Sequence, residues 1–189
     1  MTFHSDYVVR RAKVCDAESI SSIGSVTFRR AYAAVVEPKD MTGYVEQMFA
    51  PSHIASEIDQ SDSLYFIAEA EEVVLGYAKL AQTSAPDLLP ERNLIELVRL
   101  YIDDQHFDKG IGGMLLTAVR TAAIERGYSG LWLRVWEKNS GAIRFYRRHG
   151  FETVGSEPYL IGETANPVAL MFEATRIGSE QATNLYHQA

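Results

Sequence analysis

The sequence has little cysteine, and this excludes several kinds of site. Cys15 is the only cysteine among 189 residues, so no disulfide can form within the chain. No group of cysteines and histidines has the spacing of a zinc site, and we expect no metal. A lone cysteine is more often a small packing residue than a nucleophile, so we expect Cys15 to be buried.

Long apolar runs are also missing. No segment approaches the roughly 18 consecutive apolar residues that a membrane-spanning helix needs. The first residues, MTFHSDYVVRRAKV, lack the apolar core and the small-residue cleavage site of a secretory signal. We therefore expect a cytoplasmic protein that does not bind a membrane.

Basic residues are fewer than acidic ones. The chain has 18 lysines and arginines against 25 acidic residues, which gives a formal net charge of −7. Such a charge repels nucleic acid and favours small cations such as amines. Arg144, Arg147 and Arg148 form one basic cluster on a predicted helix, but there is no helix-turn-helix or zinc pattern. We interpret the cluster as a solvated face or a contact for phosphate groups, and direct nucleic-acid binding is not expected.

The length and the 47% hydrophobic content predict one globular domain, which we place at residues 7–174, with a flexible polar tail at 175–189. The periodicity predicts an α/β (α+β) fold, with a mixed, mostly antiparallel sheet flanked by helices. The expected strands cover residues 7–13, 64–70, 73–81, 94–102, 131–136, 151–154 and 169–174. The expected helices cover residues 16–32, 41–49, 53–58, 110–126 and 139–148, with Asp16 and Asn139 as N-caps.

The most informative segment is ELVRLYIDDQHFDKGIGGMLL, residues 96–116. A strand and a short polar loop lead into a predicted helix that begins at about Gly110 and has Gly112 and Gly113 in its first turn. The first N–H groups of a helix have no intrahelical partner, and the helix dipole places partial positive charge there. This start therefore predicts a site for the phosphate groups of a ligand.

The glycine spacing decides between kinds of phosphate site. A P-loop would end in Gly-Lys-Ser/Thr, a tripeptide that the chain does not contain. A dinucleotide fingerprint would need a third glycine where Leu115 stands. The remaining alternative is purely structural, since glycines also permit close packing of a helix against a strand.

A second segment, NSGAIRFYRRHGF at residues 139–151, follows the glycine segment in order. Together the two segments resemble the GNAT superfamily of acetyl-CoA-dependent N-acetyltransferases, whose signature is a strand, Gln/Arg-x-x-Gly-x-Gly/Ala and a helix. Over residues 7–173 the chain is similar to the PaiA-type spermidine/spermine acetyltransferases. This likeness rests on TFRRAY, LGYAKL, IELVRLYI and LWLRVWEKNSGAIRFYRRHGF. The chain departs from the signature at Phe107, which replaces Gln/Arg, and at Asp108, a position that is often glycine.

Tyr146 is the candidate proton donor. It lies two helical turns after Asn139 on the same predicted face. A tyrosine can give a proton to a departing thiolate without being charged beforehand. The alternative is a tyrosine at the edge of the core with a satisfied hydroxyl.

Glu96 is the candidate base. A regular strand would place it on one face with Val98, Leu100 and Ile102, where desolvation would raise the pKa of its carboxyl group. Two alternatives remain: a carboxylate paired with Arg99, Arg134 or Lys79, and an enzyme that uses ordered water as the base.

The resemblance implies acetyl-CoA as co-substrate. It places the pantetheine arm beside the backbone of Tyr101 and Ile102 and beside Asn139, the sulfur beside Tyr146, and the pyrophosphate on residues 107–113. The expected contacts are therefore Tyr101, Ile102, Phe107, Asp108, Lys109, Gly110, Ile111, Gly112, Gly113, Asn139 and Tyr146.

The function implied is acetylation of a primary amine, with a polyamine such as spermidine or spermine as the expected acceptor. The alternatives are another small amine, a protein N-terminus, or a regulatory module that binds acetyl-CoA without turnover. Homodimers are frequent among similar proteins, so a homodimer is an expected assembly.

Overall fold

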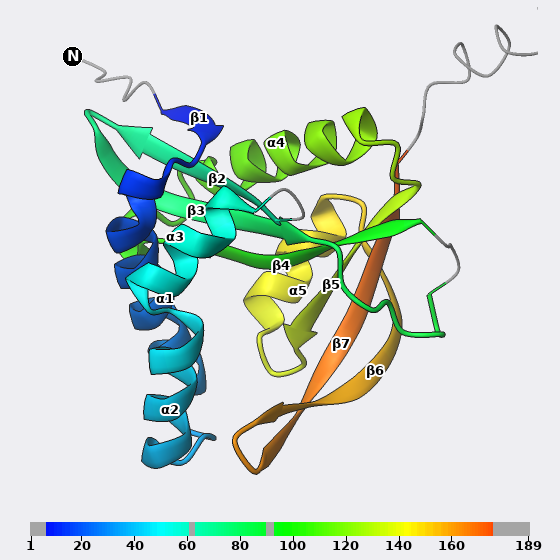
Figure 1. The fold of residues 1–189 in the computed structure, drawn as a ribbon. Coiled ribbons are helices and arrows are strands. Elements are labelled where there is room, and N and C mark those ends of the chain that lie inside the picture. The colour runs from blue at the N-terminus through cyan, green and yellow to red at the C-terminus, as the bar shows by residue number, and fades with distance from the viewer. Residues whose placement is uncertain (1–6, 61–62, 90–92, 176–189) are drawn as a thin grey trace, which may run out of the picture.

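The computed structural model describes residues 7–60, 63–89 and 93–175, and the tail expected to be flexible lies outside this range apart from Thr175. Figure 1 shows one twisted sheet with helices packed against it. The strands are β1 (Val8–Arg11), β2 (Ser63–Ala70), β3 (Val73–Ala81), β4 (Leu94–Ile102), β5 (Gly130–Trp136), β6 (Glu152–Ile161) and β7 (Thr164–Ala174). The α-helices are α1 (Ala17–Tyr32), α2 (Pro38–Met48), α3 (Pro51–Asp59), α4 (Ile111–Glu125) and α5 (Ser140–Arg148), and short 3-10 turns lie at Val14–Asp16 and Asp104–His106.

The strands form a single sheet in the order β1-β2-β3-β4-β5-β7-β6. Every neighbouring pair is antiparallel except β4 and β5, which run parallel. A parallel pair needs a crossover, and α4 supplies it. The predicted mixed, mostly antiparallel sheet with flanking helices is confirmed.

Helices cover both faces of the sheet. One face packs against α4 and α5, and this core contains Ile95, Leu97, Leu115 and Tyr146. The other face packs against α1 to α3, which lie together beside β2 to β4 in Figure 1. Alternation along each strand therefore places core residues on both sides, which explains why the central strands are apolar almost throughout.

The prolines of the N-terminal half begin helices instead of ending them. Pro38 and Pro51 occupy the first turns of α2 and α3. A proline costs no hydrogen bond there, because the N–H groups of the first turn have no intrahelical partner. The two helices expected at 41–49 and 53–58 are confirmed, but each starts two or three residues earlier than expected.

The C-terminal hairpin is longer than its hydrophobic pattern predicts. β6 and β7 continue well beyond 151–154 and 169–174, and Pro158 lies opposite Pro167 in the register. A proline cannot donate to the ladder, so its presence normally argues against a strand. Pro158 is tolerated because β6 is an edge strand, whose positions are largely exposed. Pro167 is tolerated because β7 pairs with β5 only from Val168 onward.

Two predictions near the N-terminus are wrong. Cys15 is exposed, because it lies in the short 3-10 turn before α1 and not in the core. Asp16 precedes α1 as expected, but its carboxylate does not cap the helix. Arg10 instead donates to both carboxylate oxygens, and the backbone N–H of Lys13 donates to one of them.

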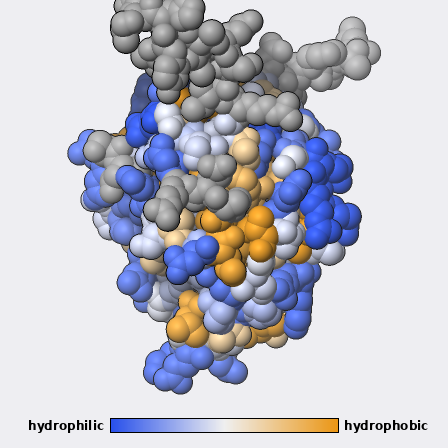
Figure 2. Space-filling model, turned by 90° about the vertical axis from the view of Figure 1, so that its right-hand side faces the viewer, coloured by the Kyte–Doolittle hydropathy of each residue, from blue (hydrophilic) through white to orange (hydrophobic). Residues whose placement is uncertain are grey.

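The surface at the β6–β7 end of the molecule is mostly hydrophilic, with apolar side chains gathered near its centre (Figure 2). Large apolar side chains that remain more than half exposed include Leu88 and Leu160. Exposed apolar side chains are normal for a folded protein, because apolar atoms supply more than half of a typical protein surface. Among the described residues, no helix is long and apolar enough to cross a membrane.

The close packing of α1 against the sheet at Gly24 leads to a stability prediction. A Cβ at Gly24 would lie 2.5 Å from Cδ1 of Phe49 and 2.6 Å from the hydroxyl of Tyr77. Gly24→Ala should therefore lower the free energy of unfolding by about 1–3 kcal/mol through overpacking. The control is Gly43→Ala in α2, where a Cβ would meet nothing within 4 Å. This substitution should raise the free energy of unfolding by about 0.5–1 kcal/mol, because it stiffens a helix interior. Urea denaturation of both variants checks the pair, and equal shifts would contradict the packing argument.

Candidate active site between β4 and β5

A bulge in β4 separates it from β5. The register between β3 and β4 moves from Lys79 opposite Arg99 to Leu80 opposite Leu97, which leaves Val98 without a partner. A bulge of this kind bends a strand and increases its twist. The parallel pairing with β5 accordingly covers only Leu94–Glu96, and the two strands part beyond that point.

A cavity of about 780 Å³ lies where the strands part. It is lined by residues 97–102 of β4, residues 134–136 of β5, the start of α4, one side of α5, and Thr27, Ala31 and Tyr32 of α1. This volume is in the usual range for small-molecule sites. The edge of β4 that faces the gap has no strand partner among the described residues beyond Glu96, so its backbone is available to a ligand. Tyr101 and Ile102, expected to offer backbone contacts, line the cavity on this edge.

The start of α4 forms one end of the cavity. Gly110 precedes the helix with a φ of 83°, and the N–H of Met114 makes the first bond, to the carbonyl of Gly110. The N–H groups of Ile111, Gly112 and Gly113 therefore have no partner within the helix. Residues 110–113 line the cavity, together with Phe107 and Asp108, whereas Lys109 is not among the lining residues. Asp108 has a φ of 59°, so a residue with a side chain holds a left-handed conformation at the position that the family often gives to glycine.

The glycines of α4 also serve close packing. A Cβ on Gly112 would lie 3.1 Å from Cζ of Phe145 and 3.3 Å from Cδ1 of Ile102. A Cβ on Gly113 would meet only Nε2 of His149, at 3.4 Å. The purely structural role that the sequence left open, close packing of the helix, therefore applies at Gly112. It does not exclude a phosphate site, because the N–H groups at the helix start remain without an intrahelical partner.

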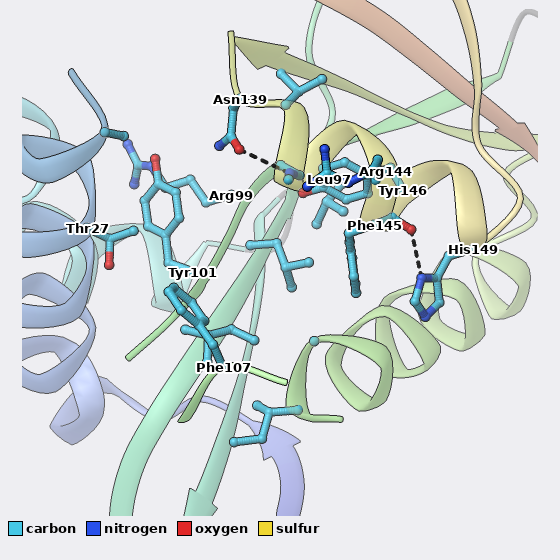
Figure 3. Close-up of a pocket in the computed structure, with 18 of the residues that line it drawn as sticks. Thr27, Leu97, Arg99, Tyr101, Phe107, Asn139, Arg144, Phe145, Tyr146 and His149 are labelled. Carbon is cyan, nitrogen blue, oxygen red and sulfur yellow. Dashed lines mark hydrogen bonds between the residues drawn. The ribbon is translucent and has the colours of Figure 1, made fainter. Parts of the chain in front are cut away.

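Helix α5 forms a second wall, and Figure 3 shows its residues on the side of the cavity away from α1. Asn139 caps this helix as predicted, because its Oδ1 accepts a hydrogen bond from the N–H of Ala142 at 3.0 Å. Asn139, Ala142 and Tyr146 all line the cavity. Of the basic cluster, Arg144 and Arg148 line the cavity, whereas Arg147 lies 3.3 Å from the hydroxyl of Thr153.

The Tyr146 side chain is 8% exposed and is held by edge-on contacts with the rings of Phe145 and Phe151. Within the described part of the chain its hydroxyl makes no hydrogen bond. Burial, with a smaller contribution from Tyr101, raises the pKa of this hydroxyl far above its usual value. The group is therefore neutral and able to donate at physiological pH.

Glu96 does not join this group, and the face predicted for it is wrong. Because the bulge shifts the alternation, Leu100 and Ile102 pack with Ile95 and Leu97 toward α4. Glu96 lies on the opposite face and is not among the residues that line the cavity.

Glu96 is only 5% exposed, and both oxygens of its carboxylate have a hydrogen-bond partner. It accepts hydrogen bonds from Nη1 of Arg134 at 2.7 Å and from the hydroxyl of Thr83 at 2.6 Å. The sequence had left a pairing with Arg134 open, and the structure contains it.

Several lining residues were missed by the sequence analysis. Arg99 and Arg134 had been considered only as partners for Glu96, and Thr27 and Tyr32 only as part of a resemblance. The lining contains four arginines, two histidines and, among the described residues, one acidic side chain, Asp108. This local charge is opposite to the net charge of the chain. The sequence signal for the residues of β4 that line the cavity was the alternation of that strand. It gave the wrong face after Val98, because a bulge has no reliable residue pattern by which it could be predicted.

Comparison with known proteins identifies the family of the chain. The model of the acetyltransferase (GNAT) family matches residues 29–151. The streptothricin acetyltransferase of Streptomyces lavendulae is 28% identical over 179 residues, covering 87% of this chain and 92% of its own. The spermidine N(1)-acetyltransferase of Thermoplasma acidophilum is 24% identical over 156 residues, covering 79% and 92%.

The fold is shared with a solved structure. The PaiA N-acetyltransferase of Thermoplasma acidophilum, crystallised with coenzyme A, superimposes with a TM-score of 0.73 at 21% identity, covering 89% of this chain and 99% of its own. The family model spans more than half of the sequence and the sheet parts where a ligand cavity lies. The protein therefore belongs to the acetyltransferase (GNAT) family and is an N-acetyltransferase.

Proposed function

We propose that the protein transfers the acetyl group of acetyl-CoA to the primary amine of a small molecule. The observation that carries this proposal is one cavity bounded by three features: the open edge of β4, the unpaired N–H groups of α4, and the hydroxyl of Tyr146. A module that only binds the coenzyme has no use for the third.

The residues at the start of α4, along α5 and on the open edge of β4 fit the coenzyme. The N–H groups of Ile111, Gly112 and Gly113 would hold the pyrophosphate, with Arg144 and Arg148 adding positive charge. The open edge of β4 at Tyr101 and Ile102 would bind the pantetheine amides as an added strand does. The amide nitrogen of Asn139 is available for the same arm, because only its oxygen is used to cap α5. Phe107, which replaces the Gln/Arg of the signature, is 54% exposed. The proposed pyrophosphate contacts come from backbone N–H groups, so this replacement does not remove them.

In the reaction the amine nitrogen forms a bond to the thioester carbon, the carbon–sulfur bond breaks, the amine releases a proton and the thiolate takes one up. We assign the second proton to Tyr146, whose neutral hydroxyl makes no hydrogen bond with another described residue. Because both oxygens of Glu96 are occupied by Arg134 and Thr83, we assign removal of the amine proton to water in the cavity and not to Glu96.

The acceptor itself is less constrained. A polyamine is supported by the net charge of −7 and by the Thermoplasma relative named as a spermidine acetyltransferase. The streptothricin acetyltransferase among the relatives supports a different amine. The lining of the cavity, with one carboxylate at the α4 end, does not favour a polycation. The proposal therefore rests at the level of a small primary amine.

The proton-donor role of Tyr146 generates one prediction. Tyr146→Phe should lower kcat about 10²-fold, because thiolate departs without an acid, while the affinity for acetyl-CoA stays within about threefold. Thiol release during turnover and calorimetric titration of the coenzyme measure the two quantities. Tyr128→Phe is the control, since Tyr128 packs against the same core outside the cavity lining. Turnover that survives in Tyr146→Phe would remove this residue from the mechanism.

The phosphate role of α4 generates a second prediction. Gly113→Asp should weaken coenzyme A binding at least about tenfold, because it sets a carboxylate beside the N–H groups that would hold the pyrophosphate. Gly113 suits this test better than Gly112, where any side chain would strike Phe145. The control is Gly113→Asn, which has the same shape without the charge. Equal affinities of the two variants in a calorimetric titration would argue against the phosphate site.

A further inference from the structure

Arg99 is a buried cation on the α1 side of the cavity. It belongs to β4, directly after the bulge, and only 5% of the residue is exposed. It lines the cavity, yet its Nη1 has no hydrogen-bond partner among the described residues. Figure 3 shows Arg99 near Thr27 and Tyr101, across the cavity from Phe145 and His149.

The two neighbouring cations are each paired with a carboxylate. Lys79, opposite Arg99 in the register, forms an ion pair with Glu57. Arg134 forms ion pairs with Glu96 and Glu157. Arg99 has no carboxylate within ion-pair distance in the described part of the chain. The positive charge of Arg99 therefore has no negative partner, whereas those of Lys79 and Arg134 do.

The groups around Arg99 are aromatic and neutral. Its guanidinium lies 4.5 Å from the centre of the Phe49 ring, and the hydroxyls of Tyr65, Tyr77 and Tyr101 surround it. These groups make its burial less costly, but they do not neutralise the charge. An arginine also cannot escape by losing its proton, because its pKa is too high.

A buried guanidinium without an anion is costly, and its planar fork matches a carboxylate. The phosphates of the coenzyme are not the missing partner. Their proposed site is at the start of α4, where Gly112 and Gly113 face Phe145 and His149 on the far side of the cavity. Arg99 therefore stands at the end of the cavity that is left for the acceptor.

We propose that the acceptor is an amine that also carries a carboxylate, and that Arg99 binds this carboxylate and so positions the amine. The inference rests on the proposed acetyl transfer and narrows its substrate class. It predicts an amino-acid-like acceptor and disfavours a polyamine, which has no anionic group to offer.

Matched pairs of amines test the proposal on the full-length protein. Ornithine and 1,4-diaminobutane differ only in the carboxylate, as do lysine and 1,5-diaminopentane, and spermidine is assayed beside them. With acetyl-CoA, kcat/KM for each carboxylate-bearing amine should exceed that of its partner by about 10²-fold, mostly through KM. Equal or better turnover of the diamines or of spermidine would overturn the proposal.

Variants show whether Arg99 causes the preference. Arg99→Met keeps the length of the side chain without the charge and should bring the ratio within each pair close to one. Arg99→Lys should keep part of it, because the charge remains while the fork is lost. The control is Arg144→Met, which should raise the KM for acetyl-CoA and leave the ratio unchanged. A ratio that survives in Arg99→Met would overturn the proposal.

A binding measurement separates this inference from the proposed function. The thermal stability of the enzyme saturated with coenzyme A is measured with and without each amine. Arg99-dependent stabilisation by ornithine or lysine but not by the diamines supports the carboxylate site even if no amine is acetylated, an outcome that would refute the proposed reaction alone. If acetyl-CoA binds but no amine is acetylated and no carboxylate stabilises the complex, the Arg99 proposal is wrong.

Discussion

The site depends on one backbone feature, the unpaired residue Val98 in β4. The bulge turns the strand away from β5 after three paired residues, and the cavity occupies the space between them. The same extra residue reverses which side chains face α4 and which face α1. Without it, the open edge of β4 would be paired with β5 and Arg99 would lie on the other face of the sheet.

The sequence predicted most elements, because these depend on local patterns. The hairpin of β2 and β3, the strand β4, and the helix that follows Gly110 were all predicted from periodicity and from the glycines at the helix start. Tyr146 and Asn139 could be placed on one face because a helix has a fixed repeat. The resemblance to known acetyltransferases supplied the chemistry that spacing alone could not.

What the sequence could not predict depends on pairing between distant strands. The side on which Glu96 lies follows from the register of β3 against β4, and one skipped residue is enough to reverse it. A proline normally argues against a strand, but Pro158 is acceptable because β6 is an edge strand, and Pro167 because it lies beyond the part of β7 that pairs with β5. The exposed Cys15 and the engaged carboxylate of Asp16 reflect a short turn that has no strong signal in the sequence.

The distribution of charge shows why net charge is a weak guide to a substrate. The chain carries −7, yet the cavity is lined mainly by basic side chains. Glu57 and Glu96 are paired with Lys79 and Arg134, and among the described lining residues Asp108 is the one acidic side chain. An acidic surface can thus surround a cavity that selects for anions, since field strength in a buried space depends on its nearest charges.

The ion pairs of Arg134 have a consequence for the energetics of binding. This side chain reaches from β5 to Glu96 on β4 and to Glu157 on β6, at the point where backbone pairing between β4 and β5 stops. It fixes the separation of the two strands before any ligand arrives. Because the two strands are held apart already in the folded protein, the entropy cost of ordering them is not added to the cost of binding a ligand.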